Sequence, residues 1–185
     1  NDRSNILKSI SKENRENNLF YEFYKSKVLP HIESQNYDAV ALSVFLPDQV
    51  LPTLLLASMI KEQNPNRKVI LGGNYLTRFK ETLGKNDELN KKIFEYVDAI
   101  IVNEGEVPFR KVLERTHRGE SFENINQVIY KKKDGGIAIN FNPTELLVMD
   151  MNRLQRPNFD GIFTDLNDRE AVFWTPSPSC SHANS

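Results

Sequence analysis

The sequence has a single cysteine, Cys180, among its 185 residues. One cysteine excludes an internal disulfide framework, and it excludes any metal site built from several cysteines of this chain. Such sparse use of cysteine is typical of proteins from a reducing compartment. We therefore expect a cytoplasmic location and no metal site within the chain itself.

Long hydrophobic runs and an excess of one charge are also missing. No stretch approaches the roughly 20 apolar residues of a membrane-spanning helix, and the polar opening of the chain lacks the apolar centre of a signal peptide. The 24 basic and 25 acidic residues leave a net charge of −1, so no overall charge attracts nucleic acid or an anionic membrane. We expect neither as a partner. The chain begins without a methionine, which favours a fragment or a processed form.

A hydrophobic content of 39% is sufficient for a real core in a chain of this length. We expect one domain with extensions, beginning with a helical segment over residues 1–36. Apolar residues recur at helical spacing from Leu19 to Ile32, which predicts a helix with one buried face. His31 stands at the end of this pattern beside Pro30, and we interpret it as a helix-terminus residue.

Residues 37–125 repeat one pattern, in which a continuous apolar stretch is followed by an amphipathic stretch. This alternation is typical of a parallel sheet covered by helices on both faces. The sequence therefore predicts a partial doubly wound α/β fold of the Rossmann or flavodoxin type. The predicted strands are residues 38–45, 68–71 and 97–102, and the predicted helices are residues 49–63, a part of 77–94, and 107–118.

The last third of the chain has a different pattern. Residues 127–133 and 137–141 alternate in polarity around the turn signal Asp134-Gly-Gly136, which predicts a β-hairpin over residues 126–142. We interpret Lys131–Lys133 as the solvated tip of this hairpin. Residues 143–185 contain several prolines and little periodicity, so we expect an extended C-terminal arm.

Three loops should meet at the carboxyl edge of the predicted sheet, where α/β proteins bind ligands. They bring together a hydroxyl, a glycine pair with exposed backbone, and two carboxylates. Each has a simpler interpretation: a hydroxyl satisfied within a strand, a tight turn, and acidic residues that complement a helix dipole. The candidate site residues are Ser43, Gly72, Gly73, Asn74, Glu104, Gly105 and Glu106.

The order of these motifs resembles a known family. An apolar strand with Ser43, then Val69-Ile-Leu-Gly-Gly73, Asp98-Ala-Ile-Ile-Val-Asn-Glu-Gly-Glu106 and Asn158-Phe-Asp-Gly161 are similar to the cobalamin-binding domain that precedes the barrel of many bacterial radical S-adenosylmethionine enzymes. The resemblance covers about residues 37–165. It implies cobalamin along the carboxyl edge of the sheet, with the nucleotide tail between strands and helices.

Carried over by position, the resemblance assigns a role to each loop. Ser43 contacts the buried tail, Gly72 and Gly73 let the cofactor pass, and Glu104 to Glu106 form the acidic loop. Asn158–Gly161 becomes the linker to a C-terminal radical barrel. If Gly73 admits the cofactor, a β-branched residue there should abolish cobalamin binding and leave the fold largely intact.

The sequence departs from the family at several points. Asn103 stands where family members commonly have glycine, and the Asp-x-His-x-x-Gly motif that supplies a cobalt ligand in methionine-synthase domains is absent. None of His31, His117 and His182 lies in such a motif, so we expect no histidine ligand to cobalt. The two strands that open the family fold are missing before Leu19.

Family members continue into Cys-x-x-x-Cys-x-x-Cys, whose thiolates hold a four-iron cluster that cleaves S-adenosylmethionine. Cys180 stands alone here, so the cluster, S-adenosylmethionine and the barrel belong only to a parent enzyme. We expect this chain to be its non-catalytic accessory domain, and the parent to transfer a methyl group or rearrange its substrate. One alternative is an α/β interaction module that has lost the cofactor. Another is a small enzyme with Glu104 and Glu106 as acid and base, although no nucleophile or histidine accompanies them.

Overall fold

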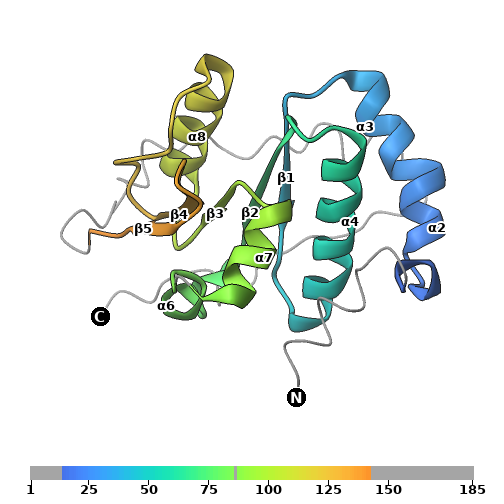
Figure 1. Cartoon of the computed structure of the whole chain (residues 1–185), viewed down its shortest axis with the longest axis horizontal. Coiled ribbons are helices and arrows are strands. Elements are labelled where there is room, and N and C mark those ends of the chain that lie inside the picture. Colours follow the sequence, from blue (N-terminus) through green and yellow to red (C-terminus); the bar gives the residue numbers. More distant parts are fainter. Residues whose placement is uncertain (1–13, 86, 143–185) are drawn as a thin grey trace, which may run out of the picture. The chain divides into compact units, whose positions relative to one another are not determined.

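The computed structural model describes residues 14–85 and 87–142, which form an α/β fold around a five-stranded sheet (Figure 1). The strand order is β1-β2-β3-β4-β5. The first three strands are parallel, whereas β4 is antiparallel to both β3 and β5. The predicted parallel α/β core is thus confirmed. The strands are β1 (Ala39–Ser43), β2 (Lys68–Gly72), β3 (Ala99–Ile101), β4 (Val128–Lys131) and β5 (Ile137–Asn140).

Helices connect the parallel strands. The helix α4 (Val50–Gln63) follows a 3₁₀ turn (Pro47–Gln49) and joins β1 to β2. Three short helices join β2 to β3, in place of the single segment predicted within residues 77–94. They are α5 (Asn74–Thr77), α6 (Lys80–Leu83) and α7 (Glu88–Tyr96), and α8 (Glu106–Arg118) follows β3. Asp87 caps α7 by accepting a hydrogen bond from the Asn90 backbone N–H at 2.8 Å.

The alternation of side chains along the strands creates two cores. Val69, Leu71 and Ile100 point to one face and pack with the leucines of α4 and with Phe94 of α7. On the opposite face, apolar residues of β2, β3 and β4 pack against α8 and the segment that follows it; they are Ile70, Ala99, Ile101, Val128 and Tyr130. Helices therefore cover both faces of the sheet, and α8 lies on the face opposite α4 (Figure 1).

The segment 119–127 explains why β4 is antiparallel to β3. Helix α8 returns the chain to the amino end of β3, and Gly119 ends the helix in the left-handed conformation with φ +67°. The next residues run back along the sheet, where Phe122 and Ile125 are buried. The chain thus reaches the carboxyl end of β3 before β4 begins, and Val128 pairs with Ile101. The predicted hairpin is present, and its strands continue the parallel sheet.

The helical lead-in is more exposed than the sequence predicted. It consists of a 3₁₀ turn (Arg15–Asn17), α2 (Tyr21–Phe23), a π-helical turn (Tyr24–Val28) and α3 (Leu29–Gln35). Tyr21 and Ile32 are buried in the core with α4, but Leu19 is 89% exposed and Phe23 is 56% exposed. The π-helical turn changes the helical period, so a face extrapolated from α3 does not continue into α2. The helix also extends past His31 to Gln35.

Other predictions fall on residues 1–13 and 143–185, which lie outside the described residues. These include the extended arm, the linker at Asn158–Gly161, and the environments of Cys180 and His182. Within the described part of the chain, no helix is long and apolar enough to cross a membrane.

Candidate functional site

The three predicted loops lie along one edge of the sheet. Ser43 pairs with Gly72, and Leu71 pairs with Ile100, so the carboxyl ends of β1, β2 and β3 are adjacent. Gln49 holds the first loop, because its Oε1 accepts hydrogen bonds from the backbone N–H groups of residues 45 and 46 at 2.6 and 3.0 Å. The prediction that these loops share an edge is confirmed.

A groove of about 440 Å³ opens on the α8 face at this edge. Its floor is built largely from small side chains on adjacent strands, namely Ala41, Ser43 and Gly72, with Ile70 and Ile101 beside them. Its wall comes from the loop after β3 and the start of α8, namely Asn103, Gly105, Glu106 and Phe109. Ala41 and Ser43 are exposed, because α8 packs over β2, β3 and β4. Within the described residues, the groove is therefore an uncovered part of a sheet face.

Glycine occurs at positions 72 and 73 for different structural reasons. A Cβ atom on Gly72 would meet only the Ile101 carbonyl oxygen, at 3.9 Å, so packing does not require glycine there. A Cβ atom on Gly73 would lie 2.4 Å from the Val44 carbonyl oxygen. Gly73 also has φ +107° and ψ 158°, a conformation open essentially only to glycine. Gly73 is thus required by the turn against Val44, and the expectation that a β-branched residue there would leave the fold intact is wrong.

Asn103 contributes a polar group that the sequence analysis did not assign to the site. Its backbone is left-handed, with φ +60°, and its backbone N–H donates to Thr77 Oγ1 at 2.8 Å. Its side-chain Nδ2 is buried and has no hydrogen-bond partner within the described part of the chain. The available signal was an amide residue in a loop where members of the family that the sequence resembles commonly have glycine. Thr77 was missed because its contact with Asn103 crosses 26 positions of sequence.

The remaining predicted residues divide into two groups. Gly105 and Glu106 line the groove together with Ser43, Gly72 and Gly73. Glu106 is the first residue of α8, where its negative charge also complements the helix dipole. Asn74 and Glu104 are exposed and do not line the groove.

The described residues contain no group of three or more histidine, cysteine or acidic side chains that could hold a metal ion. His31 lies on α3, and His117 lies in the last turn of α8. The groove is at the first turn of α8, so neither histidine lines it. A metal-containing ligand in the groove would meet no histidine or cysteine among the described residues that line it.

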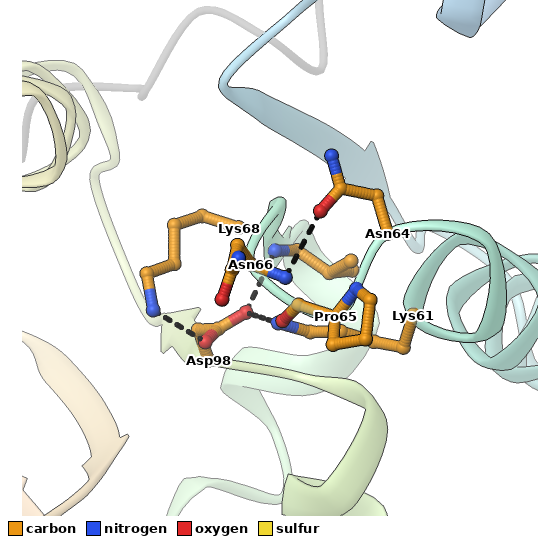
Figure 2. A network of polar contacts seen from close by, with 7 residues as sticks. Lys61, Asn64, Pro65, Asn66, Lys68 and Asp98 are labelled. Atoms are coloured by element: carbon orange, nitrogen blue, oxygen red, sulfur yellow. Dashed lines mark hydrogen bonds and ion pairs between the residues drawn. The ribbon is translucent and has the colours of Figure 1, made fainter.

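The opposite edge of the sheet is held together by charge (Figure 2). The Asp98 carboxylate lies 2.6 Å from Lys61 Nζ and 3.1 Å from Lys68 Nζ. It also accepts a hydrogen bond from the Val69 backbone N–H at 2.9 Å. The same carboxylate thus joins the end of α4, the start of β2 and the start of β3. Lys61 also donates to the Pro65 carbonyl oxygen, at 3.2 Å, just beyond the end of α4.

A second cavity, of about 550 Å³, lies at this amino edge. Its lining includes Lys61, Lys68 and Lys131–Lys133, together with Glu95, Asp98 and Glu120. The carboxyl ends of α4, α7 and α8 also reach this edge, and helix ends of that polarity attract cations. Three of these lysines pair with acidic side chains of the protein itself: Lys61 and Lys68 with Asp98, and Lys132 with Asp134.

In the comparison with known proteins, no protein-family model matches the chain, and no curated protein matches it. Any functional assignment therefore depends on the sequence and on the geometry of the site.

Proposed function

We propose that this chain is the cofactor-binding accessory domain of a radical S-adenosylmethionine enzyme and holds cobalamin in the groove at the carboxyl edge. The observation that carries this proposal is the uncovered floor of Ala41, Ser43 and Gly72 beside a buried amide nitrogen that has no partner among the described residues. A small-residue floor lets a bulky ligand approach the backbone, and an unpartnered buried donor is unfavourable until it meets an acceptor.

The residues of this edge fit a large amphipathic cofactor. Ser43 offers a hydroxyl and Asn103 offers an amide donor, while the groove bottom between them is apolar. Phe45 and Leu46, which follow β1, are 64% and 52% exposed and offer apolar surface at the same edge. Bound cobalamin would supply a cobalt-centred methyl carrier. The chain's own residues would bind and orient it without a histidine ligand from the described region.

The parent enzyme would contain the radical barrel, the four-iron cluster and the S-adenosylmethionine site. Its reaction would be methyl transfer or a rearrangement. This chain supports only the cofactor-holding part of that chemistry, because Glu106, the one acidic residue that lines its groove among the described residues, is not accompanied there by a histidine or cysteine. In this assignment Glu106 supports the start of α8 and does not act as an acid or base.

The proposal is tested by mixing the purified chain with hydroxocobalamin and measuring the cobalamin absorbance that stays with protein after gel filtration. Ser43→Leu places a bulky side chain on the groove floor and should reduce retention at least tenfold. Ser34→Leu is the matched control, because Ser34 is also exposed but lies on α3. Equal retention by wild type and Ser43→Leu would contradict binding in this groove.

A second candidate is the interaction module. Phe79 is 44% exposed and packs on Tyr75 with ring centroids 5.0 Å apart, and Phe45 and Leu46 are exposed apolar side chains as well. An apolar surface of this kind suits a protein partner. A folded wild-type chain that retains no cobalamin would favour this candidate over the first.

A further inference from the structure

Asn103 occupies a backbone position that favours glycine. Its φ of +60° lies in the left-handed region, where a side chain is disfavoured and asparagine is among the better tolerated alternatives. The turn alone would be satisfied by glycine. Asparagine also occupies the left-handed positions Asn36 and Asn124, so what distinguishes Asn103 is the environment of its side chain.

No described residue explains the amide nitrogen of this side chain. Asn103 Nδ2 is buried, lacks a hydrogen-bond partner within residues 14–85 and 87–142, and belongs to a residue that lines the groove. A buried amide donor without an acceptor destabilises the free protein. An acceptor supplied by a ligand in the groove would remove that penalty.

The backbone around Asn103 is held in place. Thr77 Oγ1 accepts the Asn103 backbone N–H at 2.8 Å, and the same hydroxyl lies 3.5 Å from the Gly73 carbonyl oxygen. Thr77 thus connects the loop after β3 to the turn after β2, and both loops border the groove. The unpartnered amide is presented on a fixed backbone.

We infer that Asn103 determines ligand specificity in this groove by donating a hydrogen bond from Nδ2 to an acceptor oxygen of the bound cofactor. This inference rests on the proposed cobalamin site. The acceptor has the chemistry of an amide carbonyl or a phosphate oxygen, and cobalamin carries both. Thr77 acts as a positioning residue, because it holds the backbone from which the amide extends.

The decisive variant is Asn103→Gly, which removes the donor and suits the left-handed backbone. We expect an unchanged or higher melting temperature together with a loss of cobalamin affinity of roughly tenfold, the size of one hydrogen bond. Asn103→Asp should lose more, because a carboxylate cannot donate to an acceptor oxygen and repels a phosphate. The matched control is Asn124→Gly, since Asn124 also has a left-handed backbone, with φ +63°, but is exposed and does not line the groove.

Affinities for cobalamin and for cobinamide, which lacks the nucleotide tail and its phosphate, distinguish the two acceptors. If Asn103→Gly weakens the binding of both ligands, the acceptor is a corrin amide. If it weakens the binding of cobalamin alone, the acceptor belongs to the nucleotide tail. A direct readout is the Asn103 side-chain NH₂ signal in NMR spectra, identified by its absence in Asn103→Gly. This signal should shift when cobalamin binds to the wild type.

Thr77→Val tests the positioning role, and Thr77→Ser should restore affinity because it returns the hydroxyl. Wild-type binding of cobalamin combined with undiminished binding by Asn103→Gly would overturn this inference and leave the proposed function standing. Failure of the folded wild type to bind cobalamin or cobinamide would overturn both. The two failures are therefore distinguishable by the wild type alone.

Discussion

The two edges of the parallel sheet differ in the polar contacts that they contain. At the amino edge, Asp98 forms ion pairs with two lysines and accepts a hydrogen bond from a backbone N–H, and its side chain is only 17% exposed. At the carboxyl edge, a buried amide of Asn103 lacks a described partner, and Phe45 and Leu46 expose apolar surface. Ion pairs of the protein itself join the elements of one edge, whereas the Asn103 amide at the other has no partner among the described residues.

The topology explains this division. Crossover helices run back from the carboxyl edge to the amino edge, so their carboxyl ends gather beside the starts of the strands. Lys61 lies in the last turn of α4, where its charge complements the helix end, and Lys61 and Lys68 join neighbouring elements through Asp98. The loops at the carboxyl edge do not have this role, and in α/β proteins that edge is where ligands generally bind.

The largest effect should come from Gly73→Val, which tests how far the carboxyl edge tolerates change. The added Cβ would lie 2.4 Å from the Val44 carbonyl oxygen, on a backbone that only glycine readily adopts. We expect a loss of more than about 3 kcal/mol in the free energy of unfolding. Gly72→Ala is the control, since its Cβ has room, and it should change stability by less than about 1 kcal/mol. Urea denaturation of both variants measures the difference, and similar losses would contradict the separate causes assigned to the two glycines.

The sequence was sufficient to locate the groove but not to explain each of its residues. Continuous apolar strands alternating with helices predicted the parallel core, and the rule for loop positions predicted the edge. The role of Gly73 depends on the approach of Val44, 29 positions earlier, and no local pattern reports such a distance. The same limit applied to Thr77, whose partner Asn103 is distant in sequence.

Exposure was the other quantity that periodicity could not supply. The spacing of Phe23 predicted burial, but a π-helical turn changes the phase of the helix before the core is reached. For β4 the predicted hairpin was correct, while its pairing with β3 depends on the course of residues 119–127. The exposure of Phe23 and the pairing of β4 both depend on where a segment lies relative to residues distant in sequence.

The next largest effect concerns the amino edge. Asp98→Ala removes the acceptor for Lys61, Lys68 and the Val69 N–H, and it leaves those groups partly buried without their partner. We expect a loss of about 2–3 kcal/mol in the free energy of unfolding. Glu88→Ala is the control, because Glu88 pairs with Lys91 while its side chain is 86% exposed, and such pairs contribute less than about 1 kcal/mol. Cobalamin affinity should stay unchanged in Asp98→Ala at temperatures where the variant is folded, because Asp98 lies at the edge opposite the groove. A loss of cobalamin affinity in the folded variant would show that the two edges are not independent.

The smallest effect is a pH dependence in the hairpin turn, whose lysines border the amino-edge cavity. The Gly136 backbone N–H donates to Asp134 Oδ1 at 2.8 Å, and Lys132 Nζ lies 3.1 Å from Oδ2. The Gly136 hydrogen bond is the larger cause, and Lys132 the next, of an Asp134 pKa below its ordinary value of 3.8. Because the folded pKa is lowered, the contribution is fully present above the unfolded pKa and is lost as the pH falls through the folded value.

This dependence can be measured as the melting temperature of wild type and Asp134→Asn between neutral pH and about pH 2. At position 134 the aspartate of the wild type titrates below about pH 4, whereas the asparagine of the variant does not titrate. The asparagine variant should lack one component of the acid-induced decrease, and Lys132→Met should retain most of it, because the backbone N–H of Gly136 remains in place. Asp134 is fully exposed, so solvent screens the charge and the shift in melting temperature should be far smaller than that of Asp98→Ala. A Lys132→Met profile that coincides with that of Asp134→Asn would reverse the order of the two causes and make the ion pair, rather than the turn hydrogen bond, the group that holds the hairpin tip.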